Sequence, residues 1–152
     1  MSAFAGNTEE YKVSAASDYL ENTLLDHVLD NVAYTSPTNV YLALFTADTG
    51  LEANNPTAEA TTPGSNGYSR ATISFASASG GSSATDATIQ VGPCTTSDWG
   101  TITHIAIVDH ATNTTWGTNV NVLFHGAVTT SKTIQVGDTF QITSGSLTVT
   151  LA

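Results

Sequence analysis

Two stretches of the chain, residues 39–46 (NVYLALFT) and residues 101–109 (TITHIAIVD), are the most apolar segments of the sequence. The first is apolar at odd and even positions alike, which is typical of a central strand buried on both faces of a sheet. The second is dominated by β-branched residues, which favour strands. We therefore expect these two segments to be buried strands at the centre of a β-rich fold.

Shorter strands are predicted around these two. In residues 68–77, Ala71, Ile73 and Phe75 alternate with polar residues, which indicates a half-buried strand. Turn-forming residues recur every 8–12 residues along the chain, as in antiparallel sandwiches and barrels. The fold class predicted is therefore mainly β: a single antiparallel β-sandwich or barrel-like domain of about eight strands. The other predicted strands are residues 87–91, 119–125, 127–129, 133–136, 140–142 and 147–151.

One helix is predicted, over residues 18–30. Ser17 or Asp18 supplies an N-cap, and Asp18 with Glu21 resembles a capping box. Apolar residues recur at helical spacing, so we expect the helix to pack on the sheet through one stripe. The stripe consists of Leu20, Leu24, Leu25, Val28 and Leu29.

Two segments have no regular pattern and are candidates for contacts with other subunits. Residues 1–16 are predicted to form an N-terminal arm that precedes a β-rich domain over residues 17–152. Residues 48–67 form a long polar loop rich in Gly, Pro and Asn, and loops of this length are often functional.

The composition limits the partners. The 152 residues carry three Lys+Arg and 13 Asp+Glu, a formal net charge of −10. With Lys12, Arg70 and Lys132 as its only fixed cations, the chain is not suited to nucleic acid or to an anionic membrane surface. No apolar run is long enough for a transmembrane helix, and the first residues lack the basic segment of a secretory signal. Surface polarity is expected to come from the 27 Thr and 15 Ser.

Histidines and acids do not have metal-ligand spacing. The four histidines, His27, His104, His110 and His125, match no known metal motif. We expect His27 on the solvent side of its helix and His104 as a hydrogen-bonded strand residue. The loop acids Asp48, Glu52 and Glu59 are too scattered for an EF-hand, although adventitious Ca²⁺ binding stays open.

No motif for nucleophilic catalysis is present, since the chain contains no G-x-S-x-G. The single Cys94 is expected to be a small buried apolar residue. Trp99 and Trp116 are expected to pack in the core or at its rim, with a subunit contact or a sugar platform as the alternative. We therefore predict no catalytic, cofactor-binding or metal-ligating residues, and no enzymatic activity.

Several segments in fixed order resemble a family of small bacteriophage virion proteins. They are ASDYLENTLLDHVL, VYLALFTAD, GYSRATISF, DWGTITHIAIVDHAT, LFHGAVTTSKTIQVGDTFQI and GSLTVTLA, which span residues 17–151. The most specific are residues 99–104 with Asp109, and residues 123–126. Members of the family are described as tail-fibre-like, head-fibre or structural proteins. One departure is the segment of residues 110–117, which lengthens a hairpin where a Gly-rich turn is expected.

The resemblance implies a structural component of the virion, assembled in the cytoplasm of the bacterial host, with no catalytic residues. Our first hypothesis is a capsid decoration or cement protein that binds the major capsid protein on the outer head surface. Self-association is expected as well, with a trimer as the form considered. The alternative is a tail or tail-fibre-associated component that contacts tail proteins and the host surface. A fibre shaft is not expected, because the chain has no repeat.

Overall fold

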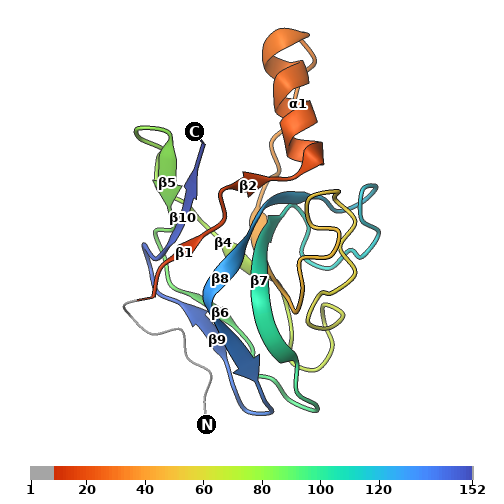
Figure 1. Cartoon of the computed structure of the whole chain (residues 1–152), viewed down its shortest axis with the longest axis vertical. Coiled ribbons are helices and arrows are strands. Elements are labelled where there is room, and N and C mark those ends of the chain that lie inside the picture. Colours follow the sequence, from red (N-terminus) through yellow and green to blue (C-terminus); the bar gives the residue numbers. More distant parts are fainter. Residues whose placement is uncertain (1–8, 152) are drawn as a thin grey trace.

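The computed structural model describes residues 9–151 and consists mainly of strands, with one helix that stands out from the body (Figure 1). The predicted mainly β fold is confirmed. The elements are β1 (Tyr11–Lys12), β2 (Ala15–Ala16), α1 (Asp18–Leu29), β3 (Val40–Phe45), β4 (Ala71–Ile73), β5 (Ser82–Ala84), β6 (Ile89–Val91), β7 (Gly100–Val108), β8 (Val122–Ile134), β9 (Phe140–Ile142) and β10 (Leu147–Thr150).

The strands form a sandwich and not a closed barrel. The largest sheet is antiparallel and has the order β2-β8-β7-β3-β4. A three-stranded sheet has the order β1-β10-β5, in which β1 runs parallel to β10, and β6 pairs with β9 in a third, two-stranded sheet. The parallel β1–β10 pair is the one departure from the predicted antiparallel arrangement among the described strands.

The two most apolar segments are neighbours at the centre of the large sheet, where β3 pairs with β7. Leu42 and Leu44 of β3 point into the main core between the sheets, while Ala43 and Phe45 point into a second cluster on the opposite face. All four residues are 0% exposed. The prediction of strands buried on both faces is confirmed, because each face of the sheet has its own apolar cover.

The second apolar cluster is covered by loops rather than by a sheet. Leu51, from the long loop of residues 48–67, is fully buried in it, as are Val120 and Val122. Residues 110–117, the segment that departs from the family pattern, form part of this cover. Trp116 packs against Phe45 with ring centroids 6.2 Å apart. The lengthened hairpin therefore closes the outer face of the sheet.

Arg70 connects the two covering loops. Its guanidinium makes two bonds of 2.7 Å with the carboxylate of Glu59 and donates to the carbonyl oxygens of His110 and Asn113. It also lies over the ring of Trp116, with Cζ 4.9 Å from the centroid. The alternation placed Arg70 on the polar side of its strand, but the structure buries its side chain completely.

The predicted arm of residues 1–16 is part of the domain where the structure describes it. Tyr11 and Val13 are buried in the main core, and β2 pairs with β8. The chain crosses β8 so closely that a Cβ on Gly126 would lie 2.3 Å from the carbonyl oxygen of Lys12. Residues 1–8 of the predicted arm lie outside the described residues.

Other boundaries also differ from the prediction. The three segments expected at 119–125, 127–129 and 133–136 largely merge into the single strand β8, which pairs with β7 continuously through Gly126. Its register against β7 shifts at two other places, between Ile102 and His104 and between Ile107 and Val108. β5 lies in a segment for which no strand was predicted, and it forms by pairing with β10. Local sequence gave no sign of these pairings, since they depend on a distant partner strand.

The Arg70–Glu59 pair provides a test of the cover. Glu59→Gln leaves the buried guanidinium without its counter-charge, and Arg70→Met leaves the largely buried Glu59 carboxylate without its cation, so each is expected to lower the free energy of unfolding by about 3–5 kcal/mol. Asp48→Asn, in the same loop but exposed, is the control and should change it by less than about 0.5 kcal/mol. Urea denaturation measures both, and equal effects of variant and control would contradict the role of Arg70.

Tyr68 provides a second test, in alkaline solution. Its hydroxyl donates to Glu59 Oε1 at 2.8 Å and accepts from the Leu44 amide at 3.0 Å. Burial, reinforced by the negative charge of Glu59, raises the pKa of Tyr68 well above its ordinary value of 10.0. The folded protein therefore keeps this proton at a pH where the unfolded chain loses it.

The free energy of unfolding should consequently be unaffected by Tyr68 ionisation below pH of about 10, and should fall by up to about 1.4 kcal/mol per pH unit above it. Tyr68→Phe removes this contribution, although it also lowers stability at neutral pH by leaving the Leu44 amide unpaired. Urea denaturation between pH 8 and 11 measures the slopes. Identical slopes for the two proteins would show that Tyr68 is not the group responsible.

Candidate interaction surface

The base of helix α1 is anchored in the large sheet. Ser17 is the N-cap: its Oγ accepts from the Leu20 amide at 3.3 Å and donates to the carbonyl of Val122. The Asp18 amide donates to the carbonyl oxygen of Glu52 at 2.9 Å. The first turn of the helix is therefore held by both the sheet and the long loop, and the sequence located the cap to within one residue.

Beyond its first turns, α1 leaves the body of the protein (Figure 1). Leu20 is 4% exposed, and Leu24 packs partly against the main core. Leu25, Val28 and Leu29, by contrast, are 56%, 73% and 77% exposed. The prediction that the whole apolar stripe packs on the sheet is wrong, because the helix stands upright on the sheet rather than lying across it.

A groove of about 630 Å³ lies at the foot of the helix. Its apolar lining comes from three parts of the chain: the segment around β2, the helix, and the end of the chain beyond β10. Leu151, which is 55% exposed, forms the wall opposite the helix. The lining residues are Ser14, Ala15, Ala16, Glu21, Leu24, Leu25, Glu52, Thr150 and Leu151.

Acidic side chains gather at the same place. Carboxylate oxygens of Asp18, Glu21 and Glu52 lie within 4.8 Å of one another, all on exposed residues. Glu52 also lies 2.9 Å from Nε2 of His125. In residues 9–151 this is the one group of three or more His, Cys, Asp or Glu side chains close enough to share a cation. The loop acids considered from the sequence are not brought together, because Glu59 is bound to Arg70.

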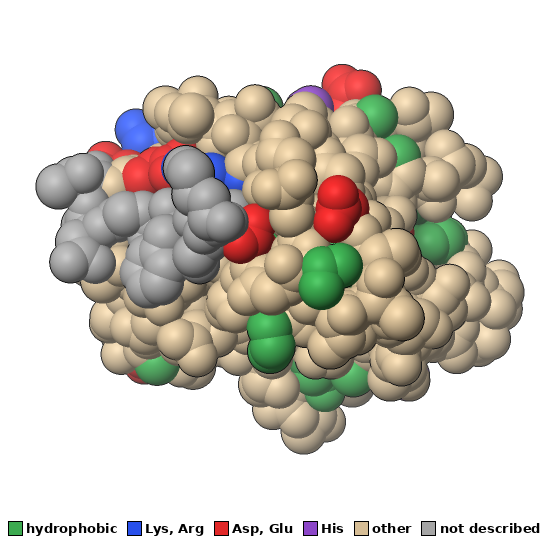
Figure 2. Space-filling model, turned by 90° about the horizontal axis from the view of Figure 1, so that it is seen from below, with side chains coloured by type: hydrophobic (Ala, Val, Ile, Leu, Met, Phe, Trp, Pro, Cys, Tyr) green, Lys and Arg blue, Asp and Glu red, His purple; other side chains and the backbone are tan. Residues whose placement is uncertain are grey.

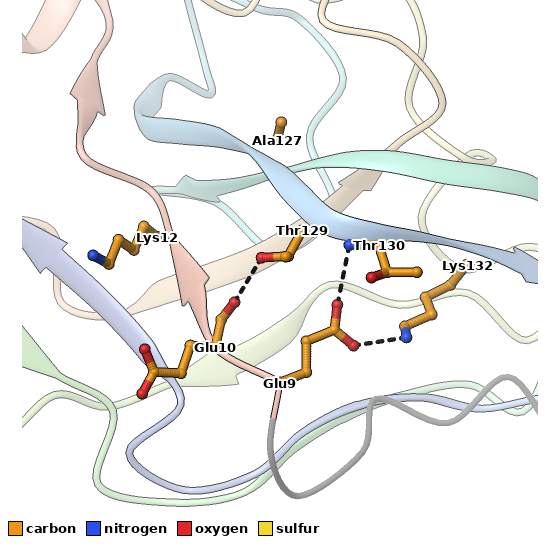
Figure 3. Close-up of a pocket in the computed structure, with 7 residues that line it drawn as sticks. All are labelled: Glu9, Glu10, Lys12, Ala127, Thr129, Thr130 and Lys132. Atoms are coloured by element: carbon orange, nitrogen blue, oxygen red, sulfur yellow. Dashed lines mark hydrogen bonds and ion pairs between the residues drawn. The ribbon is translucent and has the colours of Figure 1, made fainter.

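A second hollow, of about 710 Å³, lies between β1 and β8 (Figure 3). Glu9 extends across it, with Oε2 2.6 Å from Nζ of Lys132 and Oε1 3.3 Å from the Thr130 amide. Lys12 points away from this pair (Figure 3). This hollow is therefore bridged by a local ion pair, and it holds the two lysines of the chain.

The remainder of the surface is largely uncharged. On the face seen in Figure 2, neutral polar and backbone atoms predominate, apolar side chains are scattered, and the basic side chains lie together at one side. Among the described residues, no helix is long and apolar enough to cross a membrane. Among the described residues, most of the large apolar side chains that are exposed belong to α1, the residues just after it, or the groove at its foot.

The residues considered for chemistry are mostly structural. His27 is exposed on α1, and His104 lies 2.9 Å from Thr103 Oγ1, as predicted. Cys94 is 1% exposed, and burial together with the nearby Asp98 raises the pKa of its thiol. Trp99 is 3% exposed and donates to the carbonyl of Asn66, so the sugar-platform alternative is wrong for this residue.

The long loop of residues 48–67 is packed against the sheet over much of its length. Leu51 is buried, and Asn54 binds Asn121 and the Val122 amide through its side chain. Glu52 is the part of this loop that reaches the groove. The groove was not predicted from the sequence, because residues 14–25 and residues 150–151, which line it together, are more than 100 positions apart. The apolar stripe on α1 was its only local sign.

A rigid sandwich that holds an apolar helix face clear of its own core has the geometry of a protein that makes contacts within an assembly. The family model described as Podophage GP4 fiber I protein gp80 matches residues 15–150. The chain belongs to this family. It is therefore a bacteriophage virion structural protein, which confirms the resemblance seen in the sequence. Comparison with curated protein sequences gives no significant match.

The free energy of unfolding tests whether the first turn of α1 is buried and its last turn exposed. Leu20→Ala removes core contacts and is expected to lower the free energy of unfolding by about 2–5 kcal/mol. Val28→Gln and Leu29→Gln alter exposed side chains and should each change it by less than about 0.5 kcal/mol. Thermal and urea denaturation of the purified chain measure these values. A large loss for Val28→Gln or Leu29→Gln would mean that α1 packs on the body in solution.

Proposed function

We propose that the protein is a globular, non-enzymatic subunit of a virion fibre, held in place by non-covalent contacts. The observation that carries this proposal is the match of a fibre-protein family to residues 15–150, which covers nearly the whole sandwich and α1. The form of the chain supports a base, collar or tip more than a shaft, because it has one domain and no sequence repeat. Its partners in this proposal are other tail or fibre proteins.

The architecture is consistent with such a role. Both faces of the central sheet are covered. The Arg70–Glu59 ion pair and the Asn54–Asn121 hydrogen bond hold the covering loops in place. Helix α1 is left free to reach a neighbour. Binding of this kind depends on shape and apolar contact, and it uses no reactive group.

Decoration of the outer head surface, bound to the major capsid protein, is the second candidate. A compact acidic domain of this size suits a shell as well as a fibre, and the same experiment separates the two. Self-association, as a trimer, is part of both proposals and is measured by sedimentation of the purified chain.

Labelling of intact particles tests the location. A short peptide tag inserted after Gly80 lies on an exposed turn, where a Cβ would meet nothing within 4 Å. A second tag after Gly145, another open turn, controls for masking by neighbours. Antibody label is expected on the fibres with at least one of the two tags. Uniform label over the head would favour decoration instead, and absence of the chain from purified particles would contradict both.

A further inference from the structure

The groove and the exposed part of α1 form one continuous apolar track. Leu24 and Leu25 line the groove, and Val28 follows at the helical spacing of three to four residues, which places it on the same side of α1. Leu29 follows Leu25 at the same spacing and is 77% exposed, and Leu151 lines the groove at the foot of the helix. Apolar side chains gathered in this way mark contact sites, whereas single exposed ones do not.

The track is bordered by negative charge. Glu21 and Glu52 line the groove, with Asp18 beside them. Asp26 and Asp30 are also exposed, but helical spacing places them on the side of α1 away from Val28. No Lys or Arg lines the groove, and Glu52 is the acid that lies beside a basic group of the described chain, the imidazole of His125 at 2.9 Å.

A second copy of this chain is poorly suited to supply positive charge to these acids, because it has three fixed cations. Arg70 is buried against Glu59, and Lys132 is paired with Glu9. Lys12 lines the separate hollow between β1 and β8. Two copies that met through their helices would place the same acids opposite each other, at a net charge of −10 each, and like charges across an interface oppose association.

We propose that the track formed by α1 and its groove docks an amphipathic segment of a different virion protein, with apolar side chains at helical spacing flanked by Lys or Arg. The apolar side chains pack on Leu25, Val28 and Leu29, and the basic groups reach Glu21 and Glu52. This is the helix-in-groove mode of recognition, with charge complementarity selecting the partner. The inference rests on the proposed function only in that the partner is a virion protein.

A synthetic peptide probes the surface without the particle. The probe is an 18-residue helix with Leu on one face and Lys beside it, compared with a peptide in which Glu replaces every Lys and one in which Ser replaces every Leu. The Leu/Lys peptide is expected to bind the full chain, and the two altered peptides are not. Binding should weaken as NaCl rises, because salt screens exposed charges.

Variants locate the binding. Leu25→Gln with Val28→Gln and Leu29→Gln should weaken binding by about 100-fold or more, because three apolar contacts are lost. Glu21→Gln with Glu52→Gln should weaken it by about tenfold. The matched controls remove the same charge elsewhere, Glu10→Gln with Asp48→Asn, and one apolar group elsewhere, Val136→Gln; neither should have an effect.

Each other outcome overturns the proposal. Equal weakening by the control pair would show general attraction of a basic peptide to an acidic protein. Binding that is insensitive to the triple Gln variant would place the peptide elsewhere. Self-association of the wild-type chain that strengthens with salt and is lost in the triple variant would make a second copy the occupant.

Incorporation of variants into phage particles tests the docking surface separately from the proposed function. Phage carrying the triple Gln variant should contain much less of the protein than phage carrying the control pair, as measured by blotting purified particles. Normal incorporation of the triple variant at its fibre position would reject the docking surface and leave the proposed function intact. Absence of the wild-type chain from particles would reject the proposed function itself.

Discussion

The structure depends on one constraint, the burial of the β3–β7 pair on both faces. Leu42, Leu44, Ala43 and Phe45 occupy opposite sides of one strand and are all excluded from water. A sheet with two apolar faces requires two covers, and one small domain has only a second sheet to offer. The three-stranded sheet and the β6–β9 pair cover one face. The other face is covered by long loops, which must be held in place by specific contacts because they have no ladder of their own.

Arg70 meets this need with four hydrogen bonds and a ring contact, and it does so in a chain that has only three fixed cations. Glu59 is the counter-charge that makes burial of the guanidinium tolerable. Because the loops, the second sheet and the first turns of α1 already seal the core, the rest of α1 is not needed as a cover. The base of α1 is therefore anchored in the core, whereas its outer part presents an apolar face to solvent.

In the proposed docking, the excess of acids around the groove selects the partner of the helix surface. A chain with net charge −10 whose lysines lie together at one hollow presents acids and apolar groups elsewhere. In the docking that we propose, such a surface opposes contact between like subunits and favours a basic partner. The family match makes the protein a virion structural protein, and the proposed partner is another protein of the same particle.

The sequence by itself determined the mainly β fold, a strand buried on both faces within residues 39–46, a buried strand within residues 101–109, the helix with a cap at Ser17 or Asp18, and the burial of Cys94. These follow from periodicity, β-branching and capping, which act over a few residues. Only the tertiary structure decided that residues 9–16 join the sheets, that Arg70 is buried, and that most of the helix stripe is exposed. Such features depend on which distant segment lies opposite, and an apolar stripe has the same pattern whether its partner is the same chain or another protein.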